Sequence, residues 1–287
     1  LAQLVDAFNP ERIIIGSIFA RCEALLRPTM EEELQKEAIG HSLRGLSVVP
    51  AETGEALGDL ASIMVALHEL NIDPLLAGPE REERVLFHYE RLFERYPALS
   101  PCREQVMRAY ELLLACYQGG HKVLVAGNGG SCADAEHIVG ELMKGFYLKR
   151  PLPEETRAKL RASTEGLLPG AAELLQQSLP ALALTGHAAL STAVQNDLHP
   201  ALCMAQQVAG YGRPGDVFIG ISTSGNAQNV ALAAATAKAL GLQTLALTGG
   251  TGGRLAALCD CAIIAPAHAT ADVQEYHLPL YHALCAM

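Results

Sequence analysis

Two pairs of polar side chains stand at helical spacing in this chain, and together they could form a metal site or an acid–base pair. His137 and Glu141 are four residues apart within a helical pattern, so both side chains fall on one face. Gln274 and His282 are eight residues apart, about two helical turns, and again share roughly one face. Imidazole nitrogens, a carboxylate and an amide oxygen suit Zn²⁺. A His/Glu pair at this spacing is also common as a solvated ion pair, and spacing alone leaves both interpretations open.

Two short loops rich in glycine and hydroxyl groups follow two apolar, strand-like runs. Asn128–Ser131 comes after residues 123–126, and Ser222–Asn226 comes after residues 217–221. Glycine lets the backbone approach a ligand, and hydroxyl groups with free N–H groups at a helix start cradle a phosphate. Two such loops in one chain predict a phosphorylated small molecule bound at the carboxyl edge of a parallel sheet.

Five short apolar runs must position these loops and helices. Polar and apolar residues do not alternate in them, which is typical of parallel strands covered on both faces. Helical patterns lie between most of them, so we predict an α/β fold. The predicted strands are residues 123–126, 181–185, 217–221, 244–248 and 262–265.

Two further segments of this region have their own patterns. Ser100 as N-cap and Pro101 at the first helical position predict the start of a helix that ends at Gly119-Gly120. The polar, proline-containing segment 150–179 predicts an inserted helical hairpin or a flexible flap.

Residues 1–70 carry a separate and shorter α/β pattern. Runs at 12–16 and 46–49 predict strands, and residues 30–38 and 58–70 predict helices. The turn-forming residues 71–74 and the charged run 78–84 predict a boundary. We therefore divide the chain into a segment at 1–70, a linker and helix at 71–99, and a domain at 100–287.

Composition excludes several classes of protein. The net charge of −10 and the absence of a long basic run argue against a nucleic-acid partner. No apolar stretch approaches the roughly 20 residues needed to cross a membrane. Eight cysteines without a CxxC pair predict reduced thiols and a cytoplasmic protein. The chain begins with Leu1 and ends within a helical pattern, so we expect that it was cut from a longer protein.

Five ordered motifs in residues 85–287 resemble the sugar isomerase (SIS) domain, and the phosphoheptose isomerase family in particular. They are the two loops described above, Asn196-Asp197, Leu247–Gly250 and Gln274–His277. The resemblance implies a three-layer sandwich around a five-stranded parallel sheet, and a homotetramer with sites between subunits. The residues expected to bind a sugar phosphate are Asn128, Gly129, Gly130, Ser131, Glu141, Asn196, Asp197, Ser222, Thr223, Ser224 and Gln274. One departure is Ala227, where the family commonly places a hydroxyl.

The same resemblance favours the metal interpretation of the helical pairs. It implies one Zn²⁺ per subunit, held by His137, Glu141, Gln274 and His282. Aldose–ketose isomerisation needs a base at carbon and an acid at oxygen. We expect Glu141 to be the base, forming a cis-enediol(ate), and His282 to be the acid. His277 points about 300° of helical rotation away from Gln274, and Lys144 and Arg150 are expected to have surface roles.

Two functions of different class follow. The first is an isomerase that converts sedoheptulose 7-phosphate into D-glycero-D-manno-heptose 7-phosphate. The second is a non-catalytic sugar-phosphate-binding regulator or assembly module, in which the loops bind a ligand and no proton moves.

The first region has a resemblance of its own. Asn9–Gly16 and Leu57–Ala61 resemble the C-terminal end of a ROK-family sugar kinase. Ser17 stands where that family usually has a second glycine, and its nucleotide-binding segments are missing from the sequence. The resemblance implies a fragment without kinase activity of its own.

Overall fold

The computed structural model describes residues 12–15, 27–28, 30–32, 36, 47–50 and 79–287, and the chain divides into two compact units between Gly78 and Pro79. In the first unit, β1 (Arg12–Ile15) pairs in parallel with β2 (Ser47–Pro50), which confirms both predicted strands. Residues 27–28 are already helical, so this helix begins before the predicted start at residue 30. The predicted helix 58–70 and the turn 71–74 lie outside the described residues.

The second unit is built on an all-parallel sheet with the strand order β4-β3-β5-β6-β7. The five predicted strands are confirmed. They are β3 (Val123–Gly127), β4 (Ala181–Ala183), β5 (Val217–Ser222), β6 (Gln243–Gly249) and β7 (Cys261–Ala265). The strand β4 is shorter than predicted, because it lies at an edge of the sheet and pairs only with β3.

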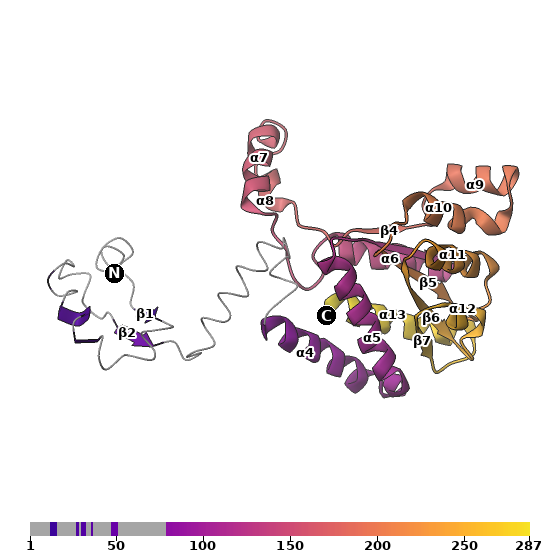
Figure 1. The fold of residues 1–287 in the computed structure, drawn as a ribbon, viewed down its shortest axis with the longest axis horizontal. Helices are drawn as coiled ribbons and strands as arrows, with labels where there is room; N and C mark the ends of the chain where they lie inside the picture. The colour runs from indigo at the N-terminus through magenta and orange to yellow at the C-terminus, as the bar shows by residue number, and fades with distance from the viewer. Residues whose placement is uncertain (1–11, 16–26, 29, 33–35, 37–46, 51–78) are drawn as a thin grey trace. The chain divides into compact units, whose positions relative to one another are not determined.

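Helices cover both faces of this sheet, so the predicted three-layer sandwich is confirmed (Figure 1). Successive side chains of a strand point to opposite faces, as Val123 and Leu124 of β3 do, and each packs into a different hydrophobic cluster. One face is covered by α4 (Pro79–Arg95), α5 (Arg103–Gln118), α6 (Gly130–Met143) and α13 (Thr270–Ala286). The other is covered by α10 (Cys203–Tyr211), α11 (Gln228–Ala239) and α12 (Gly253–Leu258), with α9 (Ala188–Asp197) packed on α10.

One prediction at the start of this unit needs correction. Ser100 is not the N-cap of a long helix, because residues Pro97–Cys102 form the 3₁₀ helix η2 and α5 begins at Arg103. The 3₁₀ turn buries Leu99 and Cys102 in the core, and this packing outweighs the local capping signal. The charged residues after Gly78 form the first turns of α4, which lies within the predicted linker and helix at 71–99, and the two units divide at this predicted boundary.

The segment 150–179 forms the helical hairpin that was one of its two predicted forms. It contains α7 (Glu154–Thr164) and α8 (Ala171–Leu174), which project from the sheet (Figure 1). Arg150 joins the two ends of this segment. Its side chain is buried and donates hydrogen bonds to the carbonyl oxygens of Leu142, 2.7 Å away, and Gln177, 3.0 Å away. The expected surface role for Arg150 is therefore wrong.

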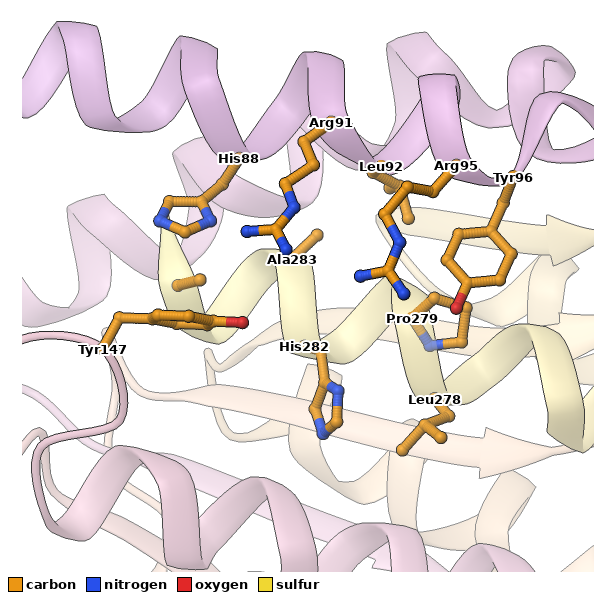
Figure 2. Close-up of a pocket in the computed structure, with 11 residues that line it drawn as sticks. His88, Arg91, Leu92, Arg95, Tyr96, Tyr147, Leu278, Pro279, His282 and Ala283 are labelled. Carbon is orange, nitrogen blue, oxygen red and sulfur yellow. The ribbon is translucent and has the colours of Figure 1, made fainter.

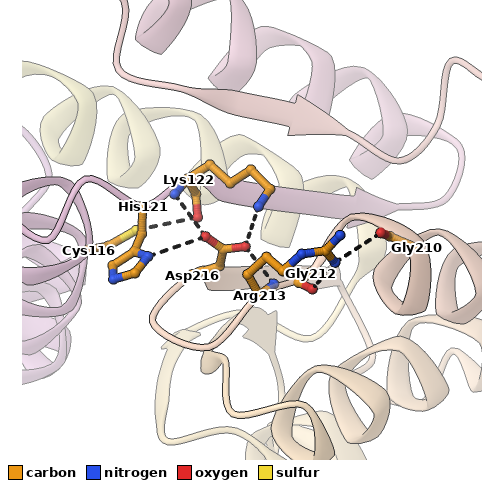
Figure 3. Close-up of polar contacts among 7 residues, drawn as sticks. All are labelled: Cys116, His121, Lys122, Gly210, Gly212, Arg213 and Asp216. Carbon is orange, nitrogen blue, oxygen red and sulfur yellow. Dashed lines mark hydrogen bonds and ion pairs between the residues drawn. The ribbon is translucent and has the colours of Figure 1, made fainter.

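A polar cluster closes the amino edge of the sheet, where β3 and β5 begin (Figure 3). The buried carboxylate of Asp216 accepts hydrogen bonds from the Lys122 side chain at 2.5 Å, the Lys122 N–H at 3.1 Å and the Arg213 N–H at 2.8 Å. His121 lies 3.9 Å away. The cluster lies at the opposite edge from the candidate loops, which indicates a structural role.

The strand order also marks where a ligand is expected. The chain runs from β3 outward to β4 and then returns to β5 on the other side of β3, so the sheet has its topological switch between β3 and β5. Crevices at the carboxyl ends of such strands are the usual ligand sites of open α/β sheets.

Across the described part of the chain, no helix is both long enough and apolar enough to span a membrane.

Candidate active site

The two glycine-rich loops lie together at the switch between β3 and β5. The strands pair in register up to Gly127 and Ile221, so both loops leave the same edge of the sheet. The side-chain amides of Asn128 and Asn229 exchange two hydrogen bonds, at 2.9 and 2.8 Å. Because Asn229 lies in the first turn of α11, this pair ties the first loop to the helix that follows the second.

The first loop turns sharply into α6 because glycines occupy it. Gly129 has a φ of 56°, which an L side chain rarely adopts, and a Cβ on Gly127 would collide with the backbone of Ser131. Ser131 is 3% exposed and lies beneath the turn, whereas Asn128 to Gly130 are exposed. The backbone at the start of α6 is therefore exposed as far as Gly130, which suits an anion.

The second loop is held by the first turn of α12. Gly225, at a φ of 67°, accepts a hydrogen bond from Leu255 N–H at 2.8 Å, and Asn226 accepts one from Arg254 N–H at 3.2 Å. Ser222 is buried, Thr223 is half-buried and Ser224 is exposed. Ala227 is the N-cap of α11 and supplies no side-chain cap. The exposed hydroxyl of this loop is that of Ser224, which accepts a hydrogen bond from Asn226 N–H at 3.2 Å.

The helices α6 and α13 run alongside each other and bring the two helical pairs together. A Cβ on Gly130 would collide with the Gln274 amide, so Gln274 lies against the first loop. Further along, the rings of His137 and His282 have centroids 5.0 Å apart. His137 Nε2 lies 3.2 Å from Glu141 Oε1. His137, Glu141 and His282 therefore lie together, and Gln274 lies at the first loop, two helical turns away along α13.

The hydroxyl of Tyr281 links His137 to Asp134. It lies 3.3 Å from Asp134 Oδ1 and 2.9 Å from His137 Nδ1. When the hydroxyl gives its hydrogen to the carboxylate, His137 donates its Nδ1 hydrogen to the Tyr281 oxygen, and the Nε2 lone pair faces Glu141 Oε1. When the hydroxyl donates to Nδ1 instead, Nε2 carries the hydrogen and donates to Glu141 Oε1. The contacts permit both tautomers, and a cation at Nε2 requires the first.

Two neighbouring atoms are buried without a hydrogen-bond partner among the described residues, Glu141 Oε2 and His282 Nε2. The nearest cation to Glu141 Oε2 is the Lys144 ammonium, 3.9 Å away. Burial, and then the neighbouring His137, lower the pKa of His282, so its imidazole is neutral near pH 7. Orphaned donors and acceptors of this kind are expected where a ligand binds.

The chemistry of these donors fits zinc, but their placement fits only in part. Two imidazoles, a carboxylate and an amide oxygen are ligands that Zn²⁺ accepts. However, within residues 79–287 and the shorter described segments, no three His, Cys, Asp or Glu side chains converge closely enough to hold a metal ion. A tetrahedral site would therefore need the amide of Gln274 and some rearrangement of the other three side chains.

Asn196 and Asp197 stand apart from these groups. They occupy the last turn of α9 rather than a free turn, both are exposed, and Asn196 donates to Asp197 at 2.7 Å. None of the side-chain hydrogen bonds between described residues joins them to the two loops. Their contact with a ligand stays a prediction.

Sequence reasoning missed three residues of this region. Asp134 and Tyr281 orient His137, and Asn229 fixes the first loop. The position of Tyr281, seven residues after Gln274, places it near the same helical face and is the signal that could have revealed it. His277, which is fully buried with Nε2 3.3 Å from the Thr248 carbonyl oxygen, packs beneath the sheet edge instead of joining the site.

Comparisons with known proteins agree with this architecture. The family model for the SIS domain matches residues 98–167 and 157–249, more than half of the chain. A phosphoheptose isomerase from Aneurinibacillus thermoaerophilus is 38% identical over 188 residues, 64% of this chain and 82% of that protein. One from a Nitratiruptor species is 35% identical over 208 residues, 72% of this chain and 96% of that protein. The chain belongs to the phosphoheptose isomerase family.

Solved structures of this family share the fold. The phosphoheptose isomerase from Neisseria gonorrhoeae is 34% identical, with a TM-score of 0.53 over 71% of this chain and 96% of that one. The enzyme from Francisella tularensis is 28% identical, with the same TM-score of 0.53 over 80% of this chain and 96% of that one. The family match thus accounts for the five-stranded sheet and the loops at its switch point.

Proposed function

We propose that this chain is an aldose–ketose isomerase that converts sedoheptulose 7-phosphate into D-glycero-D-manno-heptose 7-phosphate. The observation that carries the proposal is that Gln274 lies against the first loop at Gly130, while His137, Glu141 and His282 meet further along the same two helices. It sets an anion-binding loop about two to three helical turns from a carboxylate and a neutral imidazole. Its relatives carry the name phosphoheptose isomerase, which supports the same reaction and substrate.

The loops hold the phosphate in this proposal. The exposed backbone of Asn128 to Gly130 and the hydroxyls of Ser222, Thr223 and Ser224 bind its oxygens. Ser131, which is buried beneath the first turn, supports that loop. We assign the remaining members of the predicted set to the sugar. They are Glu141, Asn196, Asp197 and Gln274.

The chemical step is a proton transfer between adjacent carbons. Glu141 removes the proton from C1 of the ketose, which gives a cis-enediol(ate), and returns a proton to C2. The neutral imidazole of His282 moves the hydroxyl proton from O1 to O2, so the new carbonyl forms at C1. The buried, unpartnered atoms Glu141 Oε2 and His282 Nε2 are the groups we assign to these two transfers.

We also propose that His137, Glu141, Gln274 and His282 hold one Zn²⁺. A carboxylate fully bound to zinc is a poor base, so Glu141 acts as the base either because the metal shifts when substrate enters or because its own bond to the metal is loose. When bound, the metal polarises the sugar oxygens and lowers the cost of the developing negative charge. The place of His137 Nε2, which faces Glu141 because Nδ1 contacts the Tyr281 hydroxyl, supports this assignment. Metal analysis of the purified protein and titration with a chelator test it.

Solvent exchange distinguishes the enzyme from a regulator that only binds sugar phosphate. The regulator is favoured by one observation, the lack of three converging metal ligands among the described side chains. In deuterium oxide, the enzyme incorporates deuterium into sedoheptulose 7-phosphate and forms the aldose. Saturable binding without exchange, with zinc supplied, assigns the chain to the regulator class.

We propose that the active form is a homotetramer with sites between subunits. Large apolar side chains on the surface support an assembly: Leu86 and Phe87 on α4 are 56% and 59% exposed, and Tyr147 is 60% exposed. Sedimentation of the purified chain tests the proposal, and a monomer at micromolar concentration contradicts it.

For residues 1–70 we propose an origin in the C-terminal end of a ROK-family sugar kinase. The parallel pair of β1 and β2 is compatible with such an α/β fragment. A longer reading frame that supplies the missing kinase segments upstream of Leu1 would support it.

We place the protein in the cytoplasm, because the seven cysteines that the structure describes are all free thiols. Fractionation of cells tests this placement.

A further inference from the structure

A pocket of about 140 Å³ lies between α4 and α13, beside His282. Figure 2 shows the guanidinium groups of Arg91 and Arg95 directed from α4 toward α13. Tyr147, from the segment after α6, and His282 complete the opposite side. His88, Arg91 and Arg95 are spaced three and four residues apart, so one face of α4 presents all three to the pocket.

The charge of this pocket is positive and unbalanced. No Asp or Glu lines it. Among the described residues neither Arg91 nor Arg95 pairs with a carboxylate, and the nearby Glu90 is taken by Arg103 at 2.8 Å. Two cations four residues apart repel each other on a helix, and the chain as a whole carries a net charge of −10. An anion bound between the two guanidinium groups would remove this repulsion.

The pocket also has a defined place relative to the phosphate loops. Gln274 touches the first loop at Gly130, and His282 lies eight residues further along α13, roughly 12 Å at the rise of a helix. In the proposed function, the loops hold the phosphate of the sugar and His282 faces its carbonyl end, so the arginine pocket lies beyond the carbonyl end. A ligand that fills both the loops and this pocket would carry two anionic groups, one at each end of the sugar.

We propose that this pocket binds an anionic group, phosphate or carboxylate, carried at the carbonyl end of a sugar phosphate. The inference rests on the proposed function for the position of the sugar. Guanidinium groups bind such oxyanions through paired hydrogen bonds. Burial, followed by Arg91 and Arg84, lowers the pKa of His88, so a neutral imidazole supplies a further donor. The ligand class is a sugar with anionic groups at both ends, such as a bisphosphate, which would occupy the site as an inhibitor.

Calorimetric binding to the full chain tests the proposal with sedoheptulose 7-phosphate, sedoheptulose 1,7-bisphosphate and inorganic phosphate. Wild type should bind the bisphosphate at least tenfold more tightly than the monophosphate. The double variant Arg91→Gln/Arg95→Gln should lose this preference and bind the monophosphate within twofold of wild type. The control Lys159→Gln/Arg161→Gln removes the same charge from α7 and should keep the preference.

Three results would overturn the proposal. The first is an equal preference for the bisphosphate in wild type and in the arginine variant. The second is inorganic phosphate binding that depends on the arginines while wild type shows no preference for the bisphosphate, because the anion would then be a free one. The third is a changed sedimentation coefficient of the arginine variant, because the guanidinium groups would then pair with another copy of the chain. A wild type that shows the preference without deuterium exchange contradicts only the proposed function.

Discussion

At the scale of single residues, the Tyr281 hydroxyl holds the ring of His137 through Nδ1, which leaves Nε2 facing Glu141. With the hydroxyl donating to Asp134, the hydrogen of His137 lies on Nδ1 and the Nε2 lone pair can bind a metal. Second partners of this kind orient metal-binding imidazoles. The contact therefore orients His137 for the proposed metal.

Tyr281→Phe should weaken zinc binding about 10- to 100-fold, because outer partners of metal ligands have effects of this size. The variant removes one hydroxyl, so far-ultraviolet circular dichroism should stay unchanged. Competition with a chelator measures the affinity. Tyr276→Phe, on the same helix, is the matched control and should bind zinc as wild type does; an unchanged affinity in Tyr281→Phe contradicts the role of the hydroxyl.

Spacing along the chain predicted which side chains share a helix face, and it could not predict what lies across from them. The pairs His137/Glu141 and Gln274/His282 were found in this way, whereas Tyr281 and Asp134 meet only because α6 packs along α13. Arg150 was misjudged for the same reason. Its burial depends on the hairpin that returns over it, and a single surface-type residue carries no local sign of that contact.

At the scale of elements, strands were predicted well because a buried parallel strand must be apolar along its whole length. The ends of elements were predicted less well. Ser100 followed by Pro101 is a good capping signal, yet the chain forms η2 there to bury Leu99. The edge strand β4 is shorter than its apolar run, since it has a partner on one side only.

Asp216→Asn should destabilise the fold by about 2–3 kcal/mol, because the buried carboxylate accepts three hydrogen bonds and balances Lys122. Lys122 is partly exposed, which keeps the loss at the lower end of the range for buried pairs. Urea denaturation measures the free energy of unfolding. Glu155→Gln, in the exposed pair with Lys159, should leave it nearly unchanged. Equal effects of the two variants would contradict a structural role for the cluster.

The buried His277 on α13 should make stability depend on pH. Burial lowers the pKa of its imidazole in the folded state, so the unfolded chain binds a proton more readily below pH 6.5. Stability is then present above that pH and is lost as the pH falls, by up to about 1.4 kcal/mol per pH unit for this residue.

His277→Gln keeps a side-chain N–H for the Thr248 carbonyl and cannot be protonated in this range. The free energy of unfolding of the variant should therefore fall less steeply than that of wild type between pH 7.5 and pH 5. Denaturation at several pH values compares the two slopes. Parallel slopes would show that His277 does not contribute to the acid sensitivity.

At the scale of the whole molecule, the unit Pro79–Met287 carries both loops and both helices of the site. A truncated chain beginning at Pro79 should fold alone and bind sedoheptulose 7-phosphate within about threefold of the full chain. The family matches support this, because 72% of the chain aligns with 96% of a relative. Loss of binding in the truncated chain would show that the first unit contributes to the site.

The fold of this unit followed from the sequence, but the assembly did not. A five-stranded parallel sheet with ligand loops at its switch point is dictated by residues within one chain. Subunit contacts depend on the shape of the whole surface. An exposed residue such as Phe87 indicates only that its own position could lie in a contact. The tetramer and the zinc ion therefore stay proposals.

The central claim is that Glu141 moves the proton in an isomerase reaction, and Glu141→Gln tests it most directly. Proton nuclear magnetic resonance in deuterium oxide measures exchange into sedoheptulose 7-phosphate, and calorimetry measures binding of the same ligand. We predict that the variant loses exchange at least 10³-fold, a typical contribution of a general base, and binds the ligand within about threefold of wild type. Exchange at the wild-type rate would contradict the claim.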